Sequence, residues 1–378
     1  MQLTWSVLPA QEVTIEVGDV AVDVTASPPA FLGRRGRRPR ALGTHGPGAL
    51  DIAGLDPAHS YDICVRLEGG PRAKVGEVTT LAPPPGRLLG RVATVNDIHI
   101  GDRAFGVFGT IEDARPLPRG WEPHALRCAR AALREAADWG AELMLVKGDL
   151  TRDSKRGEFH QAGRLLRSAP VAVLANLGNH DVRYGVDGPG VLAGYGIEVA
   201  SEPWARDVAG LRIVLGHTPD PHHRRGHVEA EQRTRLAELA AGAEGAALVL
   251  LHHQLELSAL RRFYPPGVPA AEAVPLLDAL AAANPATLVS GGHTHRTRRH
   301  ERGPLVITEI GSTKDYPGVW AGYAVHEGGI RQVVRRVADP AAIAWNEATA
   351  EALYGLWGRW APGKLAQRCF SHTWPARS

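Results

Sequence analysis

The feature that most constrains this chain is a series of short apolar runs between residues 91 and 290, most of them separated by stretches with helical periodicity. Alternating strand-like and helix-like segments are typical of an α/β domain with a buried sheet. The stretch 123–139 begins with Pro123 and stops at Gly140, as a helix does. The stretches 229–241 and 275–283 show similar periodicity. The expected strands are 91–95, 143–146, 171–175, 247–251 and 287–290.

Polar groups of metal-binding types follow each expected strand within one to four residues. In open α/β sheets, sites form in the crevice outside the carboxyl ends of the strands. One such group alone is an ordinary turn, but five in order at strand ends indicate a shared site. The groups are Asn96-Asp97-Ile98-His99, Gly148-Asp149, Gly178-Asn179-His180-Asp181, His252-His253 and Gly291-Gly292-His293-Thr294-His295.

The donor types indicate which metal ions fit. Imidazole suits Mn, Fe or Zn, while carboxylate and amide oxygens suit harder cations. Two histidine-containing sets with one carboxylate between them could hold two ions about 3.5–4 Å apart, the spacing of two-metal phosphoryl chemistry. Thiolates are not expected to contribute, because Cys64, Cys128 and Cys369 are few and far apart.

From residue 88 to about 335, this order of motifs resembles the calcineurin-like metallophosphoesterase family. The resemblance implies a four-layer αββα sandwich of two packed mixed sheets flanked by helices. It also implies two bound ions, of Mn, Fe or Zn. By that resemblance, one metal takes Asp97, His99 and His295, the other takes Asn179, His252 and His293, and Asp149 bridges them; His253 could replace His252.

Within that family, the segments 148–151 and 178–181, with Glu158 between them, are most similar to class III cyclic-nucleotide and glycerophosphodiester phosphodiesterases. The chain departs from the family pattern at Asn96, where Ser is usual, which affects only the surroundings of the ligands. It departs again at Gln254-Leu255, where Pro-Pro is common, which predicts a substrate pocket that differs from the family's.

Residues 1–82 are expected to form a small all-β domain. The stretch 13–26 alternates apolar and polar residues, as a half-buried strand pair does. The segment resembles a fibronectin type III domain, a β-sandwich, through 54–57, Tyr61 and 79–81. Purple acid phosphatases also carry a fused β-sandwich. They have a Tyr where this chain has a His, or elsewhere in the site, so the chain is not placed with them.

The rest of the chain divides by composition. Residues 83–87 are a Pro-rich linker, 88–338 the catalytic domain, and 339–378 a helical tail expected to dock on it. Trp345, Leu353 and Trp357 are available for that docking.

The resemblance suggests a mechanism in which a metal-bridging hydroxide attacks the phosphate ester. His180 would protonate the leaving oxygen, and Asp181 could orient His180. Arg296, His217 and His223 are candidates for contact with the substrate, although a turn or a solvated loop also explains the two histidines.

Composition limits the other function classes. The net charge of +3 over 378 residues does not favour nucleic acid as a partner, and the basic segment 33–40 is interpreted as a solvated loop between two strands. No apolar run approaches the roughly 20 residues that span a bilayer. With no leader sequence visible, a cytoplasmic location is expected. The expected function is hydrolysis of small phosphodiesters, with a phosphomonoesterase, a nuclease or a non-catalytic scaffold as alternatives.

Overall fold

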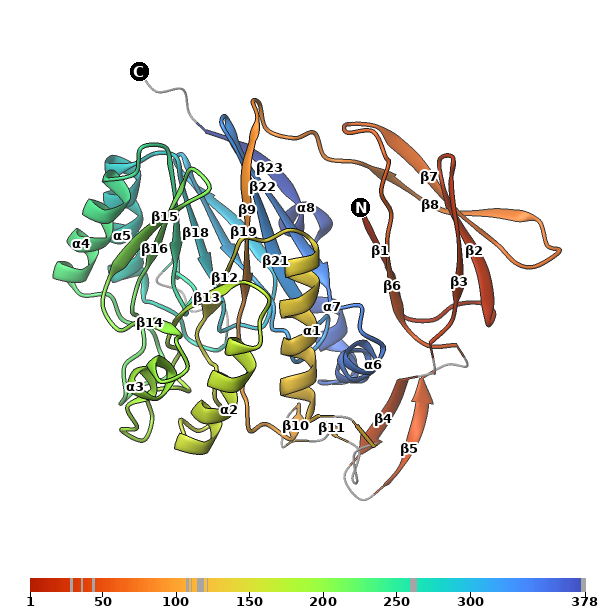
Figure 1. The fold of residues 1–378 in the computed structure, drawn as a ribbon, viewed down its shortest axis with the longest axis horizontal. Coiled ribbons are helices and arrows are strands. Elements are labelled where there is room, and N and C mark those ends of the chain that lie inside the picture. The colour runs from red at the N-terminus through yellow and green to blue at the C-terminus, as the bar shows by residue number, and fades with distance from the viewer. Residues whose placement is uncertain are drawn as a thin grey trace.

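The computed structural model, shown in Figure 1, describes most of the chain. The described residues are 1–27, 30–34, 37–42, 45–106, 109, 111–113, 119–120, 122–258 and 264–374, without the side chains of 30–34 and 37–42.

Two central sheets carry all five expected strands. The first sheet has the order β14 (Glu198–Ala200), β13 (Ala172–Asn176), β12 (Leu143–Lys147), β9 (Leu88–Val95), β21 (Val319–His326), β22 (Gly329–Arg336) and β23 (Phe370–Thr373). The second has the order β15 (Trp204–Val208), β16 (Leu211–Leu215), β17 (Ala246–Leu250), β18 (Thr287–Gly291), β20 (Leu305–Glu309) and β19 (Arg298–Arg302). Strands β9, β12 and β13 are parallel, as are β16, β17, β18 and β20, so their carboxyl ends share one edge of each sheet.

The two sheets pack face to face, with helices on their outer faces (Figure 1). Side chains such as Val92, Leu145, Leu248 and Tyr323 form the core between the sheets. Helices α1 (His124–Asp138) and α2 (Arg156–Arg167) cover the first sheet, with α3 (Gly188–Ala193) beside α2. Helices α4 (Ala230–Ala241) and α5 (Ala270–Ala283) cover the second. The predicted αββα architecture is confirmed.

The predicted helices are confirmed, with one shift. Helix α5 begins at Ala270 rather than at 275, and Pro275 lies inside it. The alanines before Pro275 have high helix propensity, and they favour a helix that continues through the proline despite the hydrogen bond lost there.

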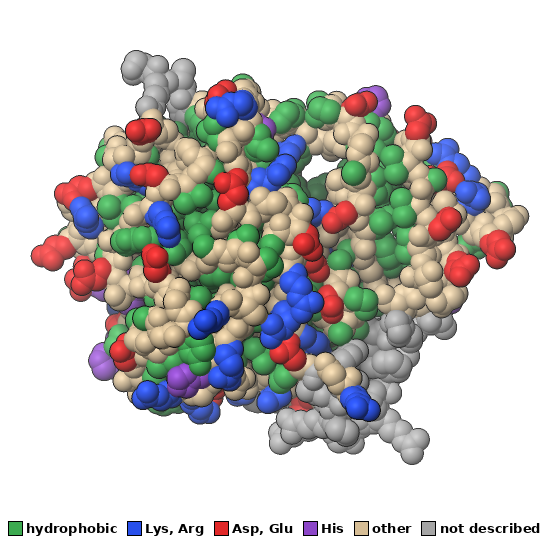
Figure 2. Space-filling view, viewed as in Figure 1, with side chains coloured by type: hydrophobic (Ala, Val, Ile, Leu, Met, Phe, Trp, Pro, Cys, Tyr) green, Lys and Arg blue, Asp and Glu red, His purple; other side chains and the backbone are tan. Residues whose placement is uncertain are grey.

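The N-terminal region is all-β, as predicted, but its core is small. One sheet has the order β3 (Val20–Thr25), β2 (Glu12–Val17), β7 (Ser60–Arg66) and β8 (Arg72–Thr79), and a second pairs β1 (Gln2–Trp5) with β6 (Gly48–Asp51). The buried cluster here contains Leu8, Val13 and Ala26. Figure 2 shows an opening between these strands and the α/β body.

A hairpin from this region reaches the α/β body. Strands β4 (Ala30–Arg34) and β5 (Arg37–Leu42) join β10 (Ala104–Phe105) and β11 (Ile111–Glu112) in one sheet. The prediction of a loop over 33–40 is therefore wrong at 33–34 and 37–40, which lie in strands. Residues 35–36 lie outside the described residues. The backbone pairs of β4 with β11 come from a distant part of the chain, which local composition does not reveal.

The tail packs on the body, but not as one helix. It forms α6 (Pro340–Thr349), α7 (Leu356–Trp360) and α8 (Leu365–Arg368) before β23. Leu353 and Tyr354 break the helix with φ of +53° and +58°, and Leu353 is 38% exposed, so its predicted docking is wrong. Trp345 is buried and stacks on His124 with ring centroids 3.9 Å apart, as docking requires. In the described part of the chain, no helix has the length and apolar character needed to cross a membrane.

Candidate metal centre

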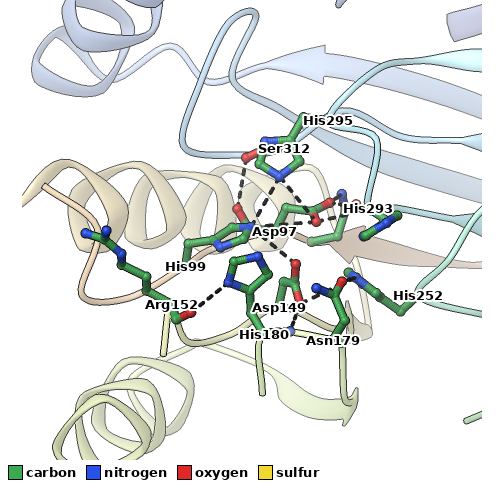
Figure 3. Close-up of polar contacts among 12 residues, drawn as sticks. Asp97, His99, Asp149, Arg152, Asn179, His180, His252, His293, His295 and Ser312 are labelled. Atoms are coloured by element: carbon green, nitrogen blue, oxygen red, sulfur yellow. Dashed lines mark hydrogen bonds and ion pairs between the residues drawn. The ribbon is translucent and has the colours of Figure 1, made fainter. Parts of the chain in front are cut away.

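The five predicted groups meet at one edge of the two central sheets (Figure 3). Parallel strands run in the same direction, so the residues that follow their carboxyl ends lie along one edge of the sheet. Asp97 and His99 follow β9, Asp149 follows β12, Asn179 and His180 follow β13, His252 follows β17, and His293 and His295 follow β18.

Asp97, His99 and His295 form the first group. The Nε2 atoms of His99 and His295 lie 3.2 Å apart, and Nε2 of His295 lies 3.5 Å from Oδ1 of Asp97. One ligand-type atom from each residue lies within 4.8 Å of the others, so the three could hold one ion.

Asn179, His252 and His293 form the second group. Nε2 of His252 lies 3.2 Å from Oδ1 of Asn179, and the rings of His252 and His293 have centroids 5.0 Å apart. His293 donates its Nε2 hydrogen to the carbonyl of Pro266 at 3.2 Å, which leaves Nδ1 as its available donor atom for a metal.

Asp149 lies between the two groups. Its Oδ2 is 3.4 Å from Nε2 of His99, and its Oδ1 is 3.4 Å from Nε2 of His252. Oδ1 also accepts a hydrogen bond from the His180 amide at 2.8 Å. One carboxylate therefore faces an imidazole of each group, the arrangement that a shared ligand requires.

Hydrogen bonds fix two of the imidazoles so that Nε2 faces the centre. His252 donates its Nδ1 hydrogen to the carbonyl of Lys147 at 2.8 Å. Nδ1 of His295 lies 2.6 Å from Oδ2 of Asp315. Such partners set the tautomer and orientation of metal-binding histidines.

His253 points to other partners. Its Nε2 donates to the carbonyl of Arg224 at 3.2 Å, and its Nδ1 accepts from the Thr218 hydroxyl at 2.8 Å. The ring lies near His293, at 4.4 Å between centroids, but both of its nitrogens are engaged. His252 is therefore the better donor of the pair.

The backbone at the centre is strained. Left-handed φ values cost non-glycine residues roughly 1–2 kcal/mol each and persist where the surrounding structure over-determines them. The predicted ligands with such φ values are Asp97 (+54°), His99 (+50°), Asp149 (+52°), His293 (+66°) and His295 (+54°).

Two glycines allow the loops after β12 and β13 to approach each other. Gly148 has φ of +80°, and a Cβ there would lie 2.6 Å from the Gly178 nitrogen. A Cβ on Gly178 would lie 2.2 Å from Oδ1 of Asp149. A side chain at Gly178 would displace Asp149, and one at Gly148 would displace the Gly178 backbone or the His252 ring.

The electrostatics fit bound cations. The carboxylates of Asp97 and Asp149 are 0% and 1% exposed, and a buried carboxylate is costly without a counter-charge. Burial alone would raise the pKa of Asp149, but the imidazoles around it, led by His252, lower it well below its usual value. Burial would lower the pKa of His252, but Asp149 raises it instead, to about 9, so a metal ion at this position would displace a proton from His252. Burial lowers the pKa of His99 and His293, which keeps them neutral as metal donors require.

His180 lies beside the first group, with its ring centroid 4.5 Å from that of His99. It donates its Nδ1 hydrogen to the carbonyl of Arg152 at 2.7 Å, and its Nε2 accepts from Arg183 at 2.9 Å (Figure 3 shows the Arg152 contact). Its ring is therefore held at the edge of the centre.

The expectation that Asp181 orients His180 needs correction. The Asp181 carboxylate accepts hydrogen bonds from the amides of Gly178, Leu150 and Thr151 and from the Thr151 hydroxyl. The carbonyl of Arg152 holds the His180 ring instead. Asp181 thus ties the loop after β12 to the loop after β13.

The predicted substrate residues lie around the centre rather than in it. Arg296 is buried and donates to the Tyr264 carbonyl at 2.9 Å. The amide of His217 donates to Gln232 on α4 at 3.1 Å, and His223 lies in an exposed loop. Among the described residues, neither histidine has a hydrogen bond or ion pair with a predicted ligand.

Two residues that support the centre, Asp315 and Ser312, were not predicted, and a third, Asn96, was expected only to affect the surroundings of the ligands. Asp315 holds His295, Ser312 donates to the Asp97 carbonyl at 2.9 Å, and Asn96 donates to the Asp97 carboxylate and to the Ile310 carbonyl. Asp315 and Ser312 follow β20, another apolar run in the same sheet. The rule that located the other groups, polar residues after an apolar run, would have found them.

Comparisons with known proteins agree with this geometry. The family model for calcineurin-like phosphoesterases matches residues 90–297, more than half of the chain. No curated protein sequence gives a significant match.

Solved structures that are similar to this chain include two of low sequence identity. One is a purple acid phosphatase from yellow lupin (Lupinus luteus), with 16% identity, 90% of this chain and 70% of that chain covered, and a TM-score of 0.47. The other is the GAP50 anchor in the inner membrane complex of Plasmodium, with 11% identity, 76% and 89% covered, and a TM-score of 0.44.

Proposed function

The chain belongs to the calcineurin-like phosphoesterase family and is a metal-dependent phosphoester hydrolase, and we propose that it acts on small phosphodiesters such as cyclic nucleotides or glycerophosphodiesters. The observation that carries the two-metal chemistry is the position of Asp149, which faces His99 at 3.4 Å and His252 at 3.4 Å, and the choice of diesters rests on the resemblance to class III phosphodiesterases. The class III assignment rests on the resemblance of the segments 148–151 and 178–181; Glu158 accepts the Asp153 amide at 2.9 Å and caps the start of α2.

The proposed centre holds two metal ions. Asp97, His99 and His295 would hold one, Asn179, His252 and His293 the other, and Asp149 both. When bound, such ions supply Lewis acidity to the phosphoryl oxygens and lower the pKa of bound water.

His180 is the proposed group at the leaving oxygen. Its Nδ1 hydrogen is committed to the Arg152 carbonyl, so any proton transfer uses Nε2. Because Arg183 donates to Nε2, that atom must gain a proton and turn away from Arg183 before it can donate. Arg183 could then pair with an anionic phosphoryl oxygen.

We also propose a division of the chain into four parts. They are a fibronectin type III-like β-sandwich (1–82), a Pro-rich linker (83–87), the catalytic domain (88–338) and a helical tail (339–378). Support for a fibronectin type III-like domain comes from Tyr61, whose hydroxyl accepts the Asp56 amide at 2.8 Å. A tyrosine that bonds back to the backbone a few residues upstream is typical of immunoglobulin-like sandwiches.

A panel of phosphate mono-, di- and cyclic esters with added Mn²⁺ tests the substrate class. We expect diesters to be hydrolysed with the highest kcat/KM, activity to disappear with a chelator, and Mn²⁺ to restore it. Faster hydrolysis of monoesters or of nucleic acid would contradict the proposal, and no hydrolysis of any ester would point to a scaffold.

A further inference from the structure

A basic hollow opens beside the second group of the metal centre. It has a volume of about 340 Å³ and is lined by His223, Arg224, Arg225 and Pro266. The three basic side chains belong to one exposed loop between β16 and α4.

Two hydrogen bonds connect the walls of the hollow to the centre. The Pro266 carbonyl accepts the Nε2 hydrogen of His293 at 3.2 Å. The Arg224 carbonyl accepts the Nε2 hydrogen of His253 at 3.2 Å, on the other wall. The hollow is therefore separated from a predicted metal ligand by a single backbone contact.

The loop backbone is fixed while its basic side chains remain at the surface. His227 donates its amide to the Thr218 carbonyl at 2.9 Å, which closes the loop. Gly226 packs on His253, since a Cβ there would lie 2.6 Å from the His253 Cβ. Arg224 also donates to the Tyr264 hydroxyl at 3.3 Å. A loop held in this way presents its arginines in a defined place.

The positive charge of the hollow is not neutralised by ion pairs. Within the described ranges, neither Arg224 nor Arg225 forms an ion pair. The loop has two acidic residues: Asp220 accepts the His222 amide at 2.7 Å, and Glu229 lies 3.7 Å from the His227 ring. His227 pairs with Glu272 at 2.7 Å.

We infer that this hollow binds a second phosphate group, carried by the substrate in addition to the scissile phosphodiester; the inference rests on the proposed function. Arginine presents N–H groups in a planar fork that matches the oxygens of a phosphate. Two neighbouring arginines and a histidine suit its double charge. Pro266 lines the hollow and also accepts a hydrogen bond from His293, so a substituent that left the centre past His293 would meet the hollow.

Two nucleoside p-nitrophenyl phosphodiesters that differ only by an added phosphate on the sugar provide the test. We expect kcat/KM to be roughly tenfold higher for the substrate with the added phosphate, through a lower KM. Arg225→Gln is expected to reduce this ratio roughly tenfold, because one charge-assisted hydrogen-bonding group is lost. Equal kcat/KM for the two substrates, or a ratio that Arg225→Gln does not change, would overturn the inference.

Arg235→Gln is the matched control. Arg235 is also exposed, lies on α4 and pairs with Glu238 at 3.3 Å, away from the hollow. Its substitution removes the same charge and is expected to leave the ratio unchanged. A fall equal to that of Arg225→Gln would mean that net charge alone, and not the hollow, attracts the phosphate.

A binding measurement separates this inference from the proposed function. Calorimetry of metal-free protein with the nucleoside carrying only the added phosphate should show binding that Arg225→Gln weakens roughly tenfold. If neither diester is hydrolysed but this binding is present, the proposed function fails and the phosphate site stands. If both diesters are hydrolysed equally and no binding occurs, the proposed function stands and the inference fails.

Discussion

The edge of the two central sheets and the N-terminal strands differ in the size of the buried clusters that support them. At the edge, five predicted ligands adopt left-handed φ values, and both central carboxylates are almost fully buried. Three large buried clusters lie behind this edge. The N-terminal strands have the small cluster around Leu8, Val13 and Ala26. Strain can be held where packing is extensive, so the demanding chemistry lies in the α/β body and the N-terminal strands tolerate more change.

The largest effect is expected at the shared carboxylate. Asp149→Ala removes the group that faces both His99 and His252, so at least one metal ion should be lost and kcat/KM should fall at least about 1000-fold. Elemental analysis and hydrolysis assays measure the two effects, with circular dichroism to confirm folding. Retention of two ions per chain would contradict the bridging role.

His180→Ala distinguishes, among the residues at this edge, a role in turnover from a role in metal binding. We expect turnover to fall about 100- to 10,000-fold with metal content near that of the wild type, because His180 is proposed to act on the leaving oxygen. His160→Ala is the control, since His160 lies on the outer helix α2 and contacts Tyr195, just after α3, at 3.1 Å. Equal loss of metal and activity in His180→Ala would show that His180 is a ligand or a structural residue.

Ile15→Ala tests the N-terminal strands, the second region of the comparison. Ile15 is 4% exposed in β2, and its truncation should lower the free energy of unfolding of the N-terminal strands by about 2–4 kcal/mol. Hydrogen exchange should show faster exchange in β2 and β7, with kcat/KM unchanged. Val75→Ala, at a 62% exposed position, is the control. Loss of activity in Ile15→Ala would show that the two regions are not independent.

A smaller effect is expected from pH at Asp113, which supports α1. Asp113 accepts the amide and ring hydrogens of His124 at 2.8 Å and pairs with Arg127 at 2.9 Å. Burial alone would raise the pKa of Asp113, but His124 and Arg127 lower it from 3.8 to about 2. The lowered pKa stabilises the fold above pH 4, and this contribution is lost as the pH falls from about 4 to about 2.

Denaturant unfolding of wild type and Asp113→Asn at several pH values measures this contribution. We expect the two proteins to differ by about 1–2 kcal/mol near pH 6 and to converge near pH 2. A difference that is constant across this range would contradict the assignment.

The meeting of the ligands at the edge of the sheets could be predicted from sequence, because it depends on short patterns along the chain. Each apolar run becomes a parallel strand, and the residues after it fall at a common edge, so Asp97, Asp149 and His252 could be placed together in advance. The hydrogen-bond partners within the site could not be predicted in this way. The partner of His180 is a backbone carbonyl, at Arg152, and backbone groups carry no sequence signal.

Other departures arise from long-range contacts and local strain. The pairing of β4 with β11 joins Arg34 to Ile111, and nothing in the composition of 33–40 indicates it. The break between α6 and α7 depends on left-handed φ values at Leu353 and Tyr354, residue types that favour helix or strand locally. These positions are decided by tertiary packing.

Anomalous diffraction from crystals of the Mn²⁺-loaded protein is the most direct test of the central claim. The account predicts two anomalous peaks on opposite sides of Asp149, one against Asp97, His99 and His295 and the other against Asn179, His252 and His293. A single peak, or peaks away from Asp149, would contradict it.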